Sequence, residues 1–314
     1  MKITIVAGAR PNFMKIAPIT RAIEAARALG KSISYRLVYT GRKDDTSLDA
    51  SLFSALDMKA PDVYLGVESS NPTSLTAGIM VAFEQELTEN PAHVVLVVDD
   101  LTATMSCAIV AKKQGIKVAH LVAGTRSFDM KMPKEVNRMI TDGLSDYLFT
   151  AGMVANRNLN QTGTESENVY YVGNILIDTI RYNRNRLLKP IWFSVLGLKE
   201  GNYLLLTLNR RVLLNDKENL RQLLNTIIEK SAGTPIVAPL TYLCTQRNQR
   251  VRHRSPESSY HATAELPLLR ISHQQSKRNH HRFRQCGRRS YFPGHSLHHA
   301  EYVCRTPGNL ANGD

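Results

Sequence analysis

The first 150 residues alternate short apolar runs with segments in which apolar residues recur at helical spacing. The apolar runs have the length of strands: KITIVAG (2–8), ISYRLVYT (33–40), HVVLVVD (93–99), KVAHLVA (117–123) and DYLFTA (146–151). They are rich in valine and isoleucine, which is typical of strands covered on both faces, and a helix is expected over about 13–29. This repeated β-α-β order predicts an α/β fold with a doubly wound, mostly parallel sheet.

The same alternation of strand and helix patterns starts again after residue 170. VYYVGNILIDTI (169–180) predicts a strand that leads into a connecting helix, and NYLLLTL (202–208) and TPIVAPL (234–240) predict further strands on either side of an amphipathic helix. We therefore predict an N-terminal Rossmann-like domain over 1–170 and the start of a second one over 171–240. The second domain is expected to be incomplete because the pattern stops there.

The composition changes at residue 241. The segment 241–314 holds 12 of the 40 Lys+Arg, 4 of the 27 Asp+Glu and 8 of the 10 His, so it carries +8 of the net charge of +13. It has almost no apolar periodicity, which predicts an irregular basic tail. Because the positive excess belongs to one segment, the charge of the whole chain is weak evidence for a nucleic-acid partner.

Other global signals exclude several classes of protein. The four cysteines show no CxxC spacing, so neither a disulfide framework nor a zinc site is expected. No apolar stretch has the length of a membrane helix, and the start of the chain does not resemble a secretory signal. We therefore expect a cytoplasmic protein with no membrane partner.

Basic residues lie in the loops that follow the predicted strands. In open parallel sheets, ligands bind beyond the carboxyl ends of the strands, where loops and helix N-termini converge. The basic residues in these loops are Arg10, Lys15, Lys43, Arg126 and Arg210. Their guanidinium and ammonium groups are suited to phosphate, so together they predict an anionic ligand.

Several motifs in the same region resemble one family. GARPNFMKIAPI (8–19) resembles the G-x-R-P-x-x-x-K start of the non-hydrolysing UDP-N-acetylglucosamine 2-epimerases. The further matches, in family order, are TG at 40–41, D-x-x-x-T from Asp100, AGxRS at 123–127, P-x-E-x-N-R at 133–138, VGNxxxD at 172–178 and LTLxR at 206–210. A lone GxRP would be weak evidence, whereas this ordered series is specific.

The resemblance implies two Rossmann-like domains in a glycosyltransferase-B-like arrangement, a homodimer, and a cleft that binds UDP-GlcNAc or UDP without a metal or nicotinamide cofactor. It also implies interconversion of UDP-GlcNAc and UDP-ManNAc by anti elimination of UDP to a glycal and re-addition. That reaction needs a base for the C2 proton, an acid on the opposite face and cations for the departing diphosphate. The matching positions imply Asp100 and Glu135 as retained catalytic carboxylates. The substrate-binding positions implied in the same way are Arg10, Lys15, Arg126, Arg138 and Arg210.

The chain departs from the family at positions that carry chemistry. Val122 replaces the glutamate of VEAGLRS, Lys134 replaces the first glutamate of P-E-E-x-N-R, and Asn209 replaces the histidine of T-x-H-R. Lys43 and Asp99 also replace a histidine and a glycine. Valine cannot exchange a proton and lysine brings the opposite charge, so we expect an impaired or inactive epimerase. One alternative is a non-catalytic protein that binds sugar nucleotides; another, a basic nucleic-acid-binding protein, is disfavoured because the tail lacks interleaved aromatic residues.

The tail also suggests an explanation for its own composition. If the coding sequence is read one base later from Glu257 onward, its possible translations include DSGNAEEEA, LGIPC and EHPETWRTG. These peptides resemble the motifs expected in the C-terminal domain of the family. We hypothesise that 241–314 is that domain translated out of frame from near Leu240.

Overall fold

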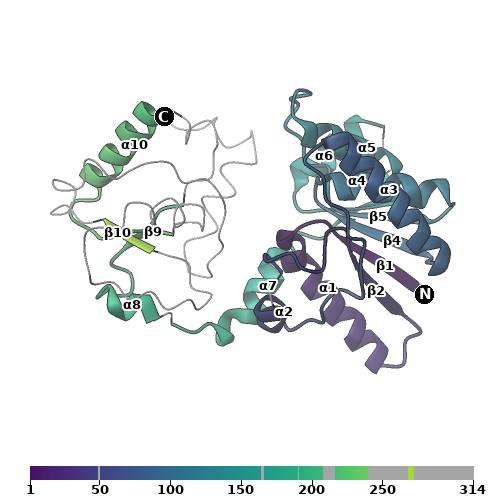
Figure 1. The fold of residues 1–314 in the computed structure, drawn as a ribbon, viewed down its shortest axis with the longest axis horizontal. Helices are drawn as coiled ribbons and strands as arrows, with labels where there is room; N and C mark the ends of the chain where they lie inside the picture. Colours follow the sequence, from purple (N-terminus) through teal and green to yellow (C-terminus); the bar gives the residue numbers. More distant parts are fainter. Residues whose placement is uncertain (49, 164–165, 190, 208–215, 240–267, 272–314) are drawn as a thin grey trace. The chain divides into compact units, whose positions relative to one another are not determined.

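The computed structural model describes residues 1–48, 50–163, 166–189, 191–207, 216–239 and 268–271, which are coloured in Figure 1. The chain forms two compact units that divide between Arg186 and Leu187. In these described ranges no helix is both long and apolar enough to cross a bilayer.

The first unit is built on a parallel sheet of seven strands in the order β3-β2-β1-β4-β5-β6-β7. Its strands are β1 (Lys2–Ala7), β2 (Ser34–Tyr39), β3 (Val63–Tyr64), β4 (Val94–Val98), β5 (Lys117–Ala123), β6 (Tyr147–Thr150) and β7 (Val169–Tyr171). The chain adds β2 and β3 on one side of β1 and then crosses over to add β4 to β7 on the other side. The doubly wound fold predicted from the sequence is therefore confirmed, and its topological switch point lies between β1 and β4.

Helices cover both faces of this sheet (Figure 1). They are α1 (Arg10–Ala28), α2 (Ala50–Leu56), α3 (Pro72–Glu89), α4 (Thr102–Lys113), α5 (Pro133–Leu144), α6 (Met153–Gln161) and α7 (Leu176–Asn183), with the 3₁₀ turns η1 (Ser166–Asn168) and η2 (Arg184–Arg186). Alternate strand residues serve the two faces: in β4, Leu96 and Val98 pack with α1 and α2, whereas Val95 and Val97 pack with α3 and α4. Burial on both faces explains why these strands read as continuous apolar runs.

Two prolines shape α1 and the docking of α7. Pro11 lies in the first turn, where its missing N–H costs no hydrogen bond, and the helix starts at Arg10 rather than near residue 13. Pro18 lies inside the helix and cannot donate to the carbonyl of Met14. Thr179 Oγ1 in α7 donates to that carbonyl at 2.5 Å instead. The segment after β7, which the sequence assigned to the second domain, thus packs on the first unit; the predicted domain limits at 170 and 240 stay predictions.

The described part of the second unit contains α8 (Ile191–Val195), β8 (Leu204–Leu205), α10 (Lys217–Lys230), β9 (Ile236–Pro239) and β10 (Leu268–Ile271). Its strands are ordered β10-β9-β8, with β8 parallel and β10 antiparallel to β9. The tail was predicted to be irregular, but residues 268–271 form a strand because the apolar run LLRI can pair with β9. The other residues of the tail lie outside the described ranges.

Candidate functional site

The loops that follow β1 and β4 meet at the switch point of the first sheet. Gly8 directly follows β1, and a Cβ atom there would lie 2.6 Å from Cβ of Ala103 in α4, so only glycine permits this approach. Asn12 Oδ1 accepts hydrogen bonds from the backbone N–H groups of Gly8 and Ala9, at 2.9 and 3.1 Å. The first loop is therefore held in a single conformation against the start of α1.

Lys15 and Asp99 form an ion pair across this switch point. Lys15 Nζ lies 2.5 and 2.7 Å from the two carboxylate oxygens of Asp99, and Asn12 Nδ2 donates to the same carboxylate at 2.9 Å. The side chains of Lys15 and Asp99 are only 9% and 12% exposed. Asp99 has a φ of +64°, in the left-handed region that favours glycine. The lysine predicted to meet a substrate thus has an anionic partner within the protein.

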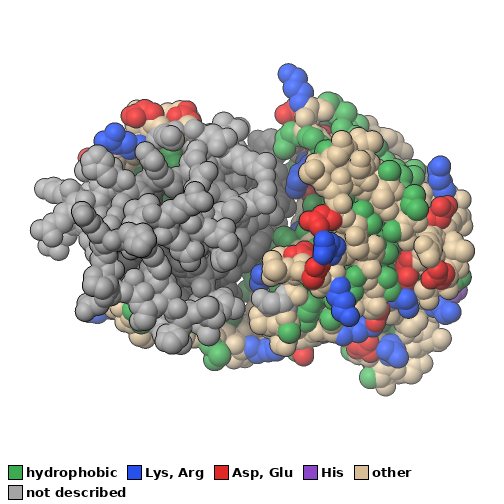
Figure 2. All heavy atoms as spheres, in the orientation of Figure 1, with side chains coloured by type: hydrophobic (Ala, Val, Ile, Leu, Met, Phe, Trp, Pro, Cys, Tyr) green, Lys and Arg blue, Asp and Glu red, His purple; other side chains and the backbone are tan. Residues whose placement is uncertain are grey.

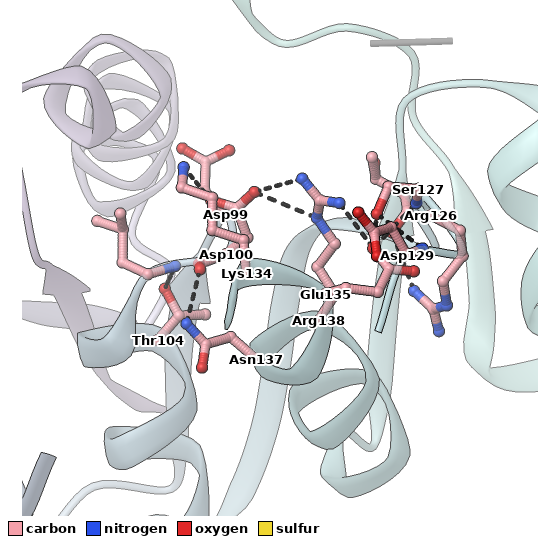
Figure 3. Close-up of polar contacts among 12 residues, drawn as sticks. Asp99, Asp100, Thr104, Arg126, Ser127, Asp129, Lys134, Glu135, Asn137 and Arg138 are labelled. Carbon is pink, nitrogen blue, oxygen red and sulfur yellow. Dashed lines mark hydrogen bonds and ion pairs between the residues drawn. The ribbon is translucent and has the colours of Figure 1, made fainter. Parts of the chain in front are cut away.

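Asp100 faces the first two turns of α5 (Figure 3). Its carboxylate accepts hydrogen bonds from Lys134 Nζ at 3.0 Å and from Arg138 Nη2 and Nε at 2.6 and 3.2 Å. Asn137 Nδ2 donates to its backbone carbonyl at 3.0 Å. Burial favours the neutral acid, but Lys134 and Arg138 outweigh it and hold the pKa of Asp100 below its usual value. Asp100 is therefore an ionised acceptor, and a weak base.

Glu135 organises the loop after β5. Its carboxylate accepts hydrogen bonds from the backbone N–H and the hydroxyl of Ser127, both at 2.9 Å, from the N–H of Phe128 at 3.1 Å, and from Arg138 Nη1 at 2.8 Å (Figure 3). Burial by itself would raise the pKa of Glu135, but the hydrogen bonds from Ser127, Arg138 and Phe128 lower it by more than that. The pKa of Glu135 therefore lies below its usual value. The carboxylate therefore holds the loop in place, with Phe128 at a φ of +57°.

A buried charged cluster lies beneath this loop. Asp142 Oδ1 lies 2.6 Å from His120 Nδ1, and its Oδ2 accepts from Arg126 Nη1 at 2.5 Å and from the N–H of Gly124 at 3.1 Å. His120 Nε2 lies 2.8 Å from the carbonyl of Asp99, so both ring nitrogens face acceptors. Burial lowers the pKa of His120, but Asp142 outweighs it and raises that pKa above the usual value. The cluster therefore places one carboxylate between the guanidinium of Arg126 and the imidazole of His120, whose protonated form it favours.

The carboxyl end of β5 has a strained backbone. The register between β5 and β6 shifts between Leu121 and Ala123, which makes Val122 the extra residue of a β-bulge. Val122 has a φ of +72°, a value that β-branched residues rarely adopt. At Gly124, a Cβ atom would lie 2.5 Å from the carbonyl oxygen of Ala155. Such strain gathers at functional sites, and here it coincides with a position that the resemblance makes catalytic.

Most of the residues singled out from the sequence gather at this edge of the sheet. Those that the structure brings there are Lys15, Asp100, Val122, Arg126, Lys134, Glu135 and Arg138. Arg10, the first residue of α1, and Lys43, after β2, are exposed. Asn209 and Arg210 lie outside the described residues. Because Lys15, Arg126 and Arg138 are all paired with carboxylates, their roles in substrate binding stay predictions.

Sequence reasoning left other members of the site without a role. His120 interrupts an apolar strand run, and a polar residue at a buried strand position signals a buried network. Asp142 follows Glu135 and Arg138 at spacings of seven and four residues, which places all three on one side of α5. The sequence does not indicate a role for Asn12, because the hydrogen bonds of its side chain depend on the fold of the first loop.

Positive and negative side chains are mixed on the visible face of the first unit. Figure 2 shows Lys and Arg side chains interspersed with Asp and Glu side chains over this unit. Within the described ranges, no three His, Cys, Asp or Glu residues are grouped so that they could hold a metal ion. The site is thus a set of paired charges rather than a basic patch.

Comparisons with known proteins show what the chain as a whole is similar to. A sequence model of a family described as UDP-N-acetylglucosamine 2-epimerase matches residues 27–277. The UDP-N-acetylglucosamine 2-epimerase of Methanocaldococcus jannaschii is 32% identical over 234 residues, which cover 73% of this chain and 62% of that protein. The UDP-2,3-diacetamido-2,3-dideoxy-D-glucuronate 2-epimerase of Pseudomonas aeruginosa is 31% identical over 243 residues, 76% of this chain and 66% of that protein. The chain therefore spans less than two thirds of the length of either relative.

A solved structure shows the same likeness in three dimensions. The crystal structure of the M. jannaschii UDP-GlcNAc 2-epimerase in complex with UDP-GlcNAc and UDP superposes with a TM-score of 0.66 at 30% identity, over 80% of this chain and 68% of that one. The motifs, the doubly wound sheet and the family match over most of the chain lead to one conclusion. The chain belongs to the UDP-N-acetylglucosamine 2-epimerase family.

Proposed function

We propose that this chain binds a uridine diphosphate sugar, and that its conversion of UDP-GlcNAc to UDP-ManNAc is impaired or absent. The binding half of the proposal is supported by the family and by the bound UDP-GlcNAc and UDP of the M. jannaschii relative. The exposed guanidinium of Arg10, at the start of α1, is available to a diphosphate. Arg210, outside the described residues, is the second guanidinium that we propose for this role.

One observation supports the proposed loss of epimerase turnover. Each of the four carboxylates at the edge of the sheet (Asp99, Asp100, Glu135 and Asp142) accepts a hydrogen bond from a cationic side chain. The pKa values of Asp100, Glu135 and Asp142 all lie below their usual values, despite burial. Lys134 and Arg138 lower that of Asp100, Ser127 and Arg138 that of Glu135, and His120 and Arg126 that of Asp142. A general base works best with a pKa near the operating pH, so these groups are poor bases for the C2 proton of the sugar.

The substituted positions do not supply the missing proton carrier. Val122 has no ionisable group, and Lys134 Nζ donates to Asp100. Loss of one general acid or base typically lowers a rate by a factor of about 10²–10⁴. We therefore place the defect in proton transfer rather than in folding of the first unit. The homodimer and the cytoplasmic location expected from the sequence stay predictions.

The test separates binding from chemistry. The full chain is incubated with UDP-GlcNAc in deuterated water, with the M. jannaschii enzyme as a positive control, and UDP-ManNAc and deuterium at C2 are followed by NMR. We expect neither product nor exchange, while titration calorimetry detects binding of UDP-GlcNAc. Exchange at a rate similar to that of the control would contradict the impairment. Absence of binding would contradict the sugar-nucleotide site itself.

A further inference from the structure

Four donors in the loop after β1 and in the first turns of α1 are used inside the protein. The N–H groups of Gly8 and Ala9 donate to Asn12 Oδ1, and Asn12 Nδ2 and Lys15 Nζ donate to the carboxylate of Asp99. As whole residues, Asn12 and Lys15 are only 1% and 7% exposed, so they form a buried, preorganised pair of donors. Such a pair is suited to a negative charge, and here that charge belongs to the chain.

The place of this carboxylate is informative. The switch point of a doubly wound sheet, beside the N-terminus of the helix after the first strand, is where such folds bind anionic ligands. Asp99 follows β4, which pairs with β1 through Ile3, Thr4 and Ile5. Its side chain crosses from the end of β4 to α1, and so it occupies the crevice between the two strands.

Contacts with β5 hold the backbone of Asp99. Its N–H donates to the carbonyl of Leu121 at 3.1 Å, and its carbonyl accepts from His120 Nε2 at 2.8 Å. Both partners belong to β5, and Asp99 is held at a φ of +64° between them. β5 thus fixes the peptide groups on both sides of Asp99, and the hydrogen bonds from Asn12 and Lys15 hold its carboxylate.

We propose that Asp99 is a built-in anion: it closes an anion-binding site formed by Asn12 and Lys15 and thereby excludes phosphate and diphosphate groups from the switch point. Asp99 is thus a specificity-determining residue. A sugar nucleotide has to place its diphosphate on other cations, such as the exposed Arg10. The proposal does not depend on the epimerase chemistry, because it concerns simple anions at one loop.

Asp99→Gly tests the proposal with inorganic pyrophosphate as the probe. Glycine adopts the left-handed backbone without strain, so the peptide hydrogen bonds to β5 are kept while the carboxylate is removed. Titration calorimetry at low salt should show that the variant binds pyrophosphate at least about tenfold more tightly than the parent chain, because a like charge no longer opposes the ligand. The gain should weaken with added salt and disappear in Asp99→Gly combined with Lys15→Gln.

The chain offers a matched control. Asp57 is an exposed aspartate with a φ of +51°, so Asp57→Gly changes the charge and the backbone in the same way, away from this site. It should gain no pyrophosphate binding. Pyrophosphate should also raise the melting temperature of Asp99→Gly and leave that of the parent chain unchanged, since a ligand stabilises only the state that binds it.

Two outcomes would overturn the proposal: a folded Asp99→Gly variant that binds pyrophosphate no more tightly than the parent, and a gain that survives Lys15→Gln. If Asp99→Gly does not fold, Asp99→Asn, which is neutral and tolerates the left-handed region, must show the same gain. If neither variant folds without an anion, pyrophosphate must restore the fold. Failure to do so would equally refute the role of Asp99.

Discussion

Asp142→Asn should be among the most damaging single changes in the first unit. The Asp142 side chain is 3% exposed and lies between His120 and Arg126, which are 1% and 4% exposed. The asparagine amide can still accept one hydrogen bond, but it carries no charge, so the guanidinium of Arg126 is left buried without a counterion. Removing one partner of a buried ion pair typically costs about 3–5 kcal/mol. Because whole domains are stable by only about 5–15 kcal/mol, this loss is a large share of the total.

The loss is measured by equilibrium urea unfolding, followed by circular dichroism, together with hydrogen exchange of the β5 amides, which reports on the first unit alone. Asp44→Asn is the control, because Asp44 pairs with Arg42 on the surface and both side chains are more than half exposed. The control should leave the unfolding midpoint unchanged. A loss of less than about 1 kcal/mol in Asp142→Asn would show that the buried cluster is not a source of stability, and the reasoning would fail.

The remaining predictions concern pH and the coding sequence. The pKa of His120 is raised in the folded protein, so its contribution to the free energy of unfolding is complete below the unfolded value of about 6.5 and is lost as the pH rises through the folded value. The pKa of Asp142 is lowered, so its contribution is lost only in acid, as the pH falls through the folded value. The stability difference between the parent chain and His120→Gln, measured by urea unfolding, should therefore shrink between pH 6 and pH 9; a constant difference would contradict the ion pair. If the out-of-frame hypothesis is correct, the gene should show a gained or lost base near the codons for 240–242 relative to an intact family member, with the next frame open beyond Asp314. Bases incompatible with DSGNAEEEA in that frame would disprove it.

The local structure of this protein could be predicted from its sequence because apolar spacing is a local property. The runs at 2–8 and 93–99 contain the strands β1 and β4, and the family motifs mark the loops that follow them. The close approaches at Gly8 and Gly124 are to α4 and α6, so they depend on the tertiary structure. The proline in the first turn of α1, by contrast, is visible in the sequence, since it answers a constraint on its own backbone. The strained φ of Val122 is not, because valine gives no sign that β5 contains a bulge.

The pairing of the charges was decided only by the tertiary structure. Lys15 and Asp99 lie far apart in the sequence, and they meet because the chain crosses the sheet between β3 and β4 and so places β4 beside β1. In the same way, Arg126 appeared as a free loop cation until α5 brought Asp142 against it. A sequence pattern specifies which residues are buried, whereas the order of the strands determines which buried charges become neighbours. Those neighbours decide whether a cation faces a ligand or a carboxylate of its own chain.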